Sequence, residues 1–237
     1  MSLRLEELAF SPTPIGDVSL RRRLDPVTGE QIFEVKLGDE FLMSSMFTAA
    51  EIALSRIGLA RLGGDELSVV VGGLGLGYTA ARALEEPRVS DLVVVELLEP
   101  VIDWHERGLV PVGPVLTADE RCRFQQGDFF AMSHGDGYDP GAPGRLFDAV
   151  LLDIDHSPRH VLADGSVGFY GVEGMSAVAQ HLVHGGVYAM WSNDPPDAAY
   201  VAVLGEVFSD VLVDVITFPN PLQGRDATAT IYSGINR

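Results

Sequence analysis

The sequence contains a single cysteine, Cys122, among its 237 residues. One cysteine cannot form a disulfide within the chain, and the absence of disulfides is typical of a reducing compartment. Arg121 and Arg123 flank this cysteine, but no residue stands out as a catalytic partner for its thiol. We therefore expect Cys122 to be structural.

Basic residues are also scarce, with 16 Lys and Arg against 34 Asp and Glu and a formal net charge of −18. Binding to a phosphate backbone requires clustered Lys and Arg, so the composition argues against a nucleic-acid partner. We expect most of the acidic charge to lie on a solvated surface. The functional alternative is a pocket for a small cationic substrate.

No apolar stretch reaches the ~18 residues that a membrane helix needs, because Gly, Asp or Glu interrupts each one. The opening "MSLRLEELAF" lacks the apolar core of a signal peptide. The sequence thus predicts a cytoplasmic protein without a membrane partner. The spacing of the histidines gathers no metal ligands, and no metal is predicted.

The order of predicted elements indicates an α/β fold in two regions. Residues 17–45 are predicted to form antiparallel strands, and residues 47–62 a helix that ends at Gly63. Apolar strands then alternate with helices up to two final strands, at residues 210–218 and 227–234. Such alternation predicts a mostly parallel, seven-stranded sheet with helices on both faces. We expect a small β region over residues 1–46 and a larger domain over 47–237, and we expect the loop 134–144 to be mobile.

A glycine-rich turn follows the first strand of the larger domain, in "SVVVGGLGLGYTAAR" (Ser68 to Arg82). The glycines stand at positions 72, 73, 75 and 77. Without Cβ atoms, a backbone can approach a nucleotide or nucleoside closely. The spacing does not fit the dinucleotide pattern GxGxxG, so the turn by itself does not identify the ligand.

Acidic residues follow three successive strands of the predicted parallel sheet. Glu96 ends "VVVE", Asp128 follows in "QGDFF", and Asp153 and Asp155 follow in "FDAVLLDIDHSP". The carboxyl ends of parallel strands form the ligand-binding edge of such sheets. An acid about 20 residues beyond the glycine turn can accept hydrogen bonds from ribose hydroxyls. For Asp128 the alternative is a helix cap before Phe129.

The order of these motifs resembles the class I S-adenosylmethionine-dependent methyltransferase fold, a Rossmann-like fold. Within it, the chain is most similar to the spermidine synthases, the polyamine aminopropyltransferases. The N-terminal hairpin layer, the helix that carries Glu51 and the signature "FDAVLLDIDHSP" support this resemblance. It covers roughly residues 17 to 234.

The resemblance implies a role for each matching residue. Gly72, Gly73, Gly75 and Gly77 would surround S-adenosylmethionine or its decarboxylated form, Glu96 would hold the ribose, and Asp128 with Phe129 would hold the adenine. Asp153 and Asp155 would be catalytic, and Glu51 and His156 would bind the amine acceptor. The resemblance also suggests a homodimer.

Two departures from the family pattern leave the reaction open. The glycine turn has Gly75 where the family has an acid, and the second acid of the later signature is replaced by His156, with Asp155 one residue early. Aminopropyl transfer to an amine is the first hypothesis. Methyl transfer from intact S-adenosylmethionine to a small molecule is the second, and nucleoside binding without catalysis is the third.

Overall fold

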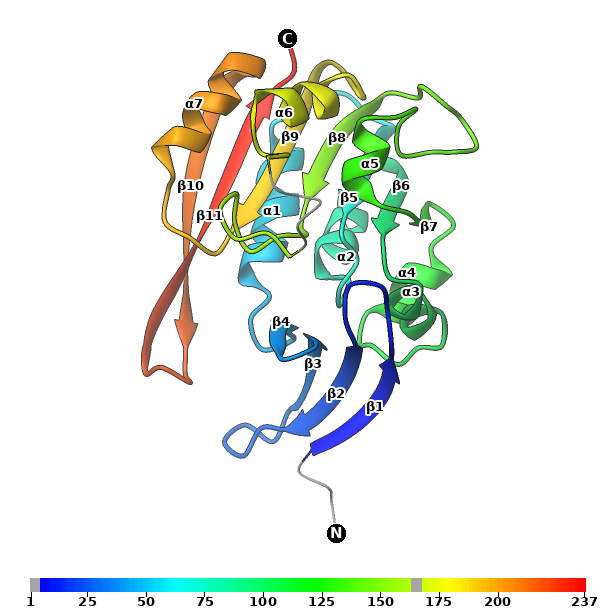
Figure 1. The fold of residues 1–237 in the computed structure, drawn as a ribbon, viewed down its shortest axis with the longest axis vertical. Coiled ribbons are helices and arrows are strands. Elements are labelled where there is room, and N and C mark those ends of the chain that lie inside the picture. The colour runs from blue at the N-terminus through cyan, green and yellow to red at the C-terminus, as the bar shows by residue number, and fades with distance from the viewer. Residues whose placement is uncertain (1–4, 163–167) are drawn as a thin grey trace.

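The N-terminal part of the chain forms a four-stranded antiparallel sheet in the computed structural model, which describes residues 5–162 and 168–237 (Figure 1). The strands are β1 (Leu5–Ser11), β2 (Val18–Leu24), β3 (Gln31–Leu37) and β4 (Glu40–Ser44), in that order across the sheet. The predicted hairpins are confirmed, and β1 adds an edge strand that the sequence pattern did not indicate. Asp25 shapes the β2–β3 turn, because its carboxylate accepts from Val27 N at 2.7 Å.

A seven-stranded sheet forms the larger part of the molecule. Its strands, in chain order, are β5 (Leu67–Gly72), β6 (Val89–Glu96), β7 (Cys122–Gln126), β8 (Phe147–Leu152), β9 (Leu182–Ser192), β10 (Ser209–Asn220) and β11 (Arg225–Ile235). Across the sheet the order is β10-β11-β9-β8-β5-β6-β7. Strands β7, β6, β5, β8 and β9 pair in parallel, and β11 runs antiparallel to both of its neighbours. The mostly parallel Rossmann-like sheet predicted from the sequence is confirmed.

Helices cover both faces of this sheet. They are α1 (Ala49–Ala60), α2 (Tyr78–Leu84), α3 (Glu99–Glu106), α4 (Gly113–Ala118), α5 (Phe129–Ser133), α6 (Val172–Ala179) and α7 (Ala198–Val207). Successive residues of β5 point to opposite faces, so Val69 and Val71 join one core cluster and Val70 joins the other. The first cluster packs against α1, α2 and α3, and the second against α5, α6 and α7. The short helix α4 was not predicted.

The segment 134–144, predicted to be mobile, is anchored at its centre in this structure. Tyr138 is fully buried, stacks on Phe129 with ring centroids 4.8 Å apart, and shares a hydrogen bond of 2.9 Å with Ser133 Oγ. Asp139 forms ion pairs with Arg123 and Arg145. These contacts fix the segment beside α5.

Two expectations from the composition concern the role of Cys122 and the length of apolar segments. Burial raises the pKa of the Cys122 thiol to about 12, which suits a structural cysteine better than a nucleophile. Among the described residues, none of the helices has the length and hydropathy that a membrane crossing requires.

The strand order reverses at β5, which has β6 on one side and β8 on the other. At such a point the two following connections leave in opposite directions and open a crevice at the carboxyl ends of the strands. In Figure 1 the arrowheads of β6, β8 and β9 point toward the N-terminal sheet. The crevice therefore opens toward that sheet, which forms its other wall.

Gly73 is the residue at which this crevice is most sensitive to substitution. Its φ is +94°, and a Cβ there would collide with the backbone carbonyl of Asp153. We expect Gly73→Ala to cost about 1–2 kcal/mol from the left-handed backbone and about 1–3 kcal/mol more from the collision. Denaturant unfolding measures this loss.

Gly64→Ala is the matched control for Gly73→Ala. Gly64 has a φ of +78°, but nothing lies within 4 Å of its Cβ position. It should therefore show the backbone cost alone. Equal losses in the two variants would contradict the close approach at Gly73.

Candidate functional site

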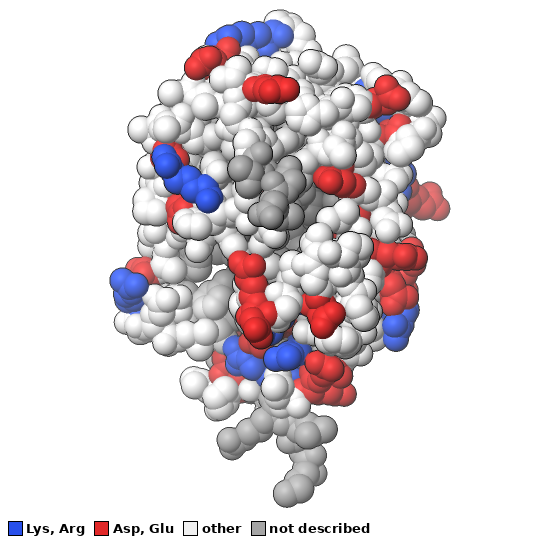
Figure 2. Space-filling model, in the orientation of Figure 1, with Lys and Arg blue, Asp and Glu red and all other residues white. Residues whose placement is uncertain are grey.

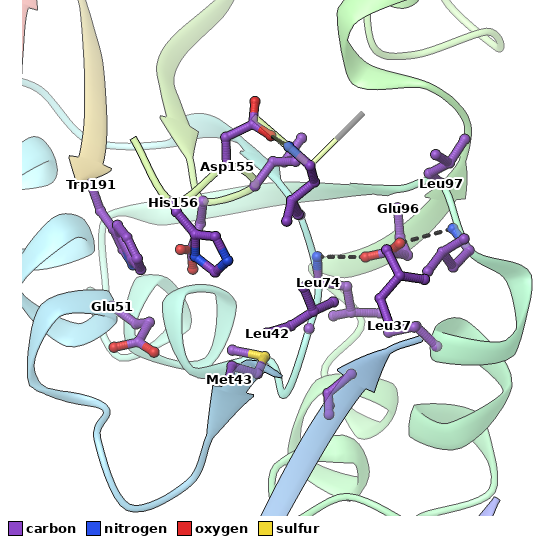
Figure 3. Close-up of a pocket in the computed structure, with 18 of the residues that line it drawn as sticks. Leu37, Leu42, Met43, Glu51, Leu74, Glu96, Leu97, Asp155, His156 and Trp191 are labelled. Atoms are coloured by element: carbon purple, nitrogen blue, oxygen red, sulfur yellow. Dashed lines mark hydrogen bonds between the residues drawn. The ribbon is translucent and has the colours of Figure 1, made fainter. Parts of the chain in front are cut away.

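A cavity of about 560 Å³ lies between the N-terminal sheet and the carboxyl ends of the parallel strands. Its volume is in the range of small-molecule sites, roughly 300–1,000 Å³. The N-terminal sheet contributes an apolar wall that includes Leu37, Leu42 and Met43 (Figure 3). The opposite wall carries the predicted site residues Glu51, Gly73, Gly75, Glu96, Asp128, Phe129, Asp153, Asp155 and His156.

The four predicted glycines divide into two pairs. Gly73 and Gly75 line the cavity, whereas Gly72 and Gly77 do not appear among its lining residues. The Cβ position of Gly72 is filled by the Phe129 ring, and Gly77, with a φ of +89°, packs against His105 and begins α2. Gly72 and Gly77 thus allow the turn to pack, and Gly73 and Gly75 expose backbone to the cavity.

Met43 covers part of the glycine turn from the N-terminal sheet. Its Sδ lies 3.0 Å from Leu76 N and occupies the space where a Cβ of Gly75 would stand. A thioether is a weak acceptor, so this contact leaves the turn with an apolar cover. The resemblance places an acid at position 75. In this chain that position is Gly75, and the apolar side chain of Met43 covers it.

Glu96 ends β6, and its carboxylate accepts a hydrogen bond from the backbone of the glycine turn. One carboxylate oxygen accepts from Leu74 N at 2.9 Å, and the other accepts from Leu98 N at 2.8 Å (Figure 3). Burial raises the pKa of Glu96, and hydrogen bonds from the backbone at Leu98, Leu74, Gly75 and Leu97 oppose that rise. Glu96 thus anchors the glycine turn, and it also lines the cavity.

Asp128 and Phe129 connect β7 to α5 at the same edge of the sheet. Asp128 caps α5, with Oδ1 accepting from Phe130 N at 2.9 Å and from Ala131 N at 3.3 Å. The ring of Phe129 is buried against Tyr138. Phe130, which the sequence pattern did not single out, is half-buried and also lines the cavity.

Glu51, which is buried, and Asp153, which is half-buried, bring two carboxyl groups to the cavity wall. Asp153 follows β8 and its Oδ2 accepts from Thr79 Oγ1 at 2.5 Å, while Glu51 lies in the first turn of α1. Burial raises the pKa of Asp153 to about 6, against the effect of the Thr79 hydrogen bond. Burial and then the charge of Asp153 raise the pKa of Glu51 to about 8. Both carboxyl groups therefore retain a proton to higher pH than exposed carboxyl groups do.

Asp155 and His156 are held by other parts of the chain. The two oxygens of Asp155 accept from Leu162 N at 2.6 Å and from Tyr170 Oη at 2.6 Å. His156 Nε2 lies 3.2 Å from Glu40 Oε1 in β4, so it links the sheet edge to the N-terminal sheet. Both residues line the cavity, but Asp155 has a clear structural role in fixing the segment after β8.

Several lining residues were not predicted from the sequence. They are the apolar residues of β3 and β4, Phe47 before α1, Trp191 at the end of β9, and Phe218 and Ala229 of the C-terminal hairpin. Apolar side chains in strands carry the same pattern whether they fill a core or line a cavity. Thr79, in the first turn of α2, does not line the cavity but donates to Asp153, and its place after the glycine turn could have indicated it.

The cavity is acidic. None of its described lining residues is Lys or Arg, whereas five are acids: Glu51, Glu96, Asp128, Asp153 and Asp155. On the face in Figure 2, most basic side chains lie beside acidic ones. Within residues 5–162 and 168–237, no group of three or more His, Cys, Asp or Glu side chains could hold a metal ion. The acids of the cavity would attract positive charge more strongly than they would in water, because the cavity is poorly hydrated.

The fold and the position of the cavity define a Rossmann-like protein with a cavity at the switch point of its sheet. No protein-family model and no curated protein matches the chain by sequence. Among solved structures, the chain has the fold of the spermidine synthases. It matches the Thermotoga maritima spermidine synthase with a TM-score of 0.71 and 14% identity, over 97% of this chain and 72% of that one. It also matches a spermidine synthase in complex with the transition-state analogue AdoDATO, with a TM-score of 0.69, 14% identity and the same coverage.

The buried carboxyl pair should make stability depend on pH. The pKa of Glu51 is about 8 in the folded protein against an ordinary value of 4.5, so the folded state binds more protons between these values. Stability should fall as pH rises through this window, by up to about 1.4 kcal/mol per pH unit. Glu51→Gln should remove the part of the decline above about pH 6, where Asp153 no longer contributes, and be more stable than the parent chain by about 1–3 kcal/mol near pH 9.

Denaturant unfolding at about pH 4 and about pH 9 measures the difference. Glu106→Gln is the control, because Glu106 is exposed on α3 and its loss should change stability little at either pH. A Glu51→Gln variant that is less stable than the parent chain near pH 9 would contradict the cost assigned to the buried carboxylate.

Proposed function

We propose that this protein binds a cationic sulfonium nucleoside, decarboxylated S-adenosylmethionine, and transfers its aminopropyl group to an amine. The observation that carries the proposal is the buried Glu51–Asp153 pair in a cavity whose described lining residues include no Lys or Arg. The spermidine synthase fold supports the same class of reaction.

The charge of the cavity favours the decarboxylated co-substrate over the intact one. Intact S-adenosylmethionine carries a carboxylate, which would find no basic side chain among the described lining residues. A sulfonium and an ammonium group would instead meet buried carboxyl groups in a poorly hydrated site, where attraction between opposite charges is strong. The neighbouring charge would also lower the raised pKa values of Glu51 and Asp153.

The nucleoside would lie along the ends of β6 and β7. Glu96, which lines the cavity, would accept the ribose hydroxyls. Asp128 Oδ2 does not take part in the helix cap and would accept from the adenine amino group. Phe130 and the edge of Phe129 would pack against the base, with Gly73 and Gly75 along the sulfonium side.

The carboxyl pair would prepare the acceptor amine for attack. The amine enters as an ammonium ion and must lose a proton to expose its lone pair, which the Asp153 carboxylate can accept. The nitrogen then attacks the methylene carbon next to sulfur: a C–N bond forms, the C–S bond breaks, and its electron pair returns to sulfur. The products are methylthioadenosine and the aminopropylated amine, which carries its positive charge as a secondary ammonium ion, and Asp153 passes the proton that it took to solvent.

Methyl transfer from intact S-adenosylmethionine is the second candidate function. It is favoured by the apolar glycine turn, which offers no carboxylate to an aminopropyl ammonium group and is covered by Met43. Nucleoside binding without catalysis is the third, and the same experiments address it.

Calorimetric titration with decarboxylated S-adenosylmethionine, S-adenosylmethionine and methylthioadenosine tests the proposal. We expect the decarboxylated form to bind at least about tenfold more tightly than the intact form, a difference of about 1.4 kcal/mol. Tighter binding of the intact form would support the methyltransferase alternative. Binding of none of the three would overturn the nucleoside site.

Asp153→Asn should separate binding from catalysis. The amide keeps the shape of the side chain but cannot take up a proton, so turnover should fall by roughly 10²-fold or more. Asp148→Asn is the matched control, because Asp148 lies on the same strand and its carboxylate accepts from Ser68 N, at 2.8 Å. Parental turnover in Asp153→Asn would remove the assigned role.

Glu96→Ala should weaken methylthioadenosine binding by about 1–3 kcal/mol, because the ribose hydroxyls would lose their acceptor. The same variant leaves Leu74 N and Leu98 N without their partner, so it should also lower the unfolding free energy by a similar amount. Calorimetry and denaturant unfolding measure the two effects. A loss of stability with unchanged nucleoside affinity would restrict Glu96 to a structural role.

A further inference from the structure

The two ends of the cavity differ in chemistry. Glu96 and Leu97 lie at one end and Glu51 and Trp191 at the other, as Figure 3 shows. With the nucleoside at the Glu96 end, as proposed above, the acceptor would occupy the end formed by Glu51 and Trp191. The walls of this second end therefore indicate which amine it takes.

These walls are mainly aromatic and apolar. Phe47 precedes α1, and its ring centroid lies 6.3 Å from that of Phe218 in β10. Trp191 lies opposite Ile231 where β9 pairs with β11, and this pairing brings the C-terminal hairpin, with Phe218 and Ala229, to the same end. Figure 1 shows this hairpin running down past the main sheet toward the level of the N-terminal sheet.

The carboxyl groups available to an acceptor are those of Glu51 and Asp153. Asp155 has both oxygens engaged by Leu162 and Tyr170, and Glu96 and Asp128 belong to the nucleoside end. Asn193, which follows β9, also lines the cavity, and its side-chain amide is uncharged. Glu51 and Asp153 can match one ammonium group at this end, and a second ammonium group on a linear chain would lie among the rings of Phe47, Trp191 and Phe218.

We infer that the acceptor is a primary amine with one positive charge and an apolar body, aliphatic or aromatic, rather than a linear diamine. The inference rests on the proposed transfer reaction and names the class of its acceptor. The ammonium group faces Glu51 and Asp153, and the body lies among Phe47, Trp191 and Phe218. An apolar body gains from leaving water among these rings. A second ammonium group in the same place would lose its hydration without an opposite charge.

The test compares butylamine with 1,4-diaminobutane, two amines of equal chain length that differ by one terminal ammonium group. Each is titrated calorimetrically into the protein saturated with methylthioadenosine and into the free protein, at about pH 8.5, with 2-phenylethylamine as an aromatic probe. We expect the two monoamines to bind at least about tenfold more tightly than the diamine, and to be the better acceptors in the transfer assay.

Substitution of Phe218 provides a gain of function. Phe218→Asp places a carboxylate on the apolar wall, and Phe218→Asn is the control of similar size without the charge. The ratio of diamine to monoamine affinity should rise at least about tenfold in Phe218→Asp relative to Phe218→Asn. Should both variants fail to fold, the comparison of amines on the parent protein still decides.

The outcomes distinguish the inference from the function beneath it. Preference of the parent protein for 1,4-diaminobutane, with decarboxylated S-adenosylmethionine still bound, overturns the acceptor class and leaves aminopropyl transfer standing. Failure of every sulfonium nucleoside to bind overturns the proposed function, while the amine titrations on the free protein still test the subsite. Binding of none of the amines in either state overturns the inference.

Discussion

The site depends on how closely the glycine turn approaches the end of β8. Asp153 N donates to Gly72 O at 2.7 Å, and Gly73 N donates to Val95 O at 2.9 Å, so three neighbouring strands are joined at one point. The carbonyl of Asp153 lies where a side chain of residue 73 would stand. This packing holds the Asp153 carboxylate toward Thr79 at the start of α2 and fixes the floor of the cavity. A larger residue at position 73 would separate the turn from the acid.

Placing two carboxyl groups at the floor of the cavity lowers the stability of the fold. Two carboxyl groups are buried beside each other, and the raised pKa values of Glu51 and Asp153 express the cost of ionising them there. Neutral side chains at these positions would make the fold more stable. The two acids therefore indicate a function that uses their charge. The same burial that costs stability makes the attraction for a cationic substrate strong.

The fold of the spermidine synthases is present here at 14% identity. The alternation of buried strands and helices tolerates extensive apolar exchange, because packing requires volume and pattern more than particular residues. The glycine turn lacks an acid, Met43 covers it, and Phe47, Trp191 and Phe218 line the opposite end. Function therefore has to be argued from the cavity of this chain and not from the fold alone.

The sequence by itself determined the architecture and the edge of the sheet at which the site lies. Strand and helix periodicity indicated the parallel sheet, and the rule that parallel strands share one carboxyl edge predicted that Glu96, Asp128 and Asp153 lie along the same edge. The helical position of Glu51 was visible too, but its burial beside Asp153 was not, because that depends on how α1 packs on the sheet. The engagement of Asp155 by Tyr170 and the cover of the glycine turn by Met43 were equally hidden. Such contacts join residues far apart in the chain, so only the tertiary structure decided which acids face the cavity and which side chains form its far end.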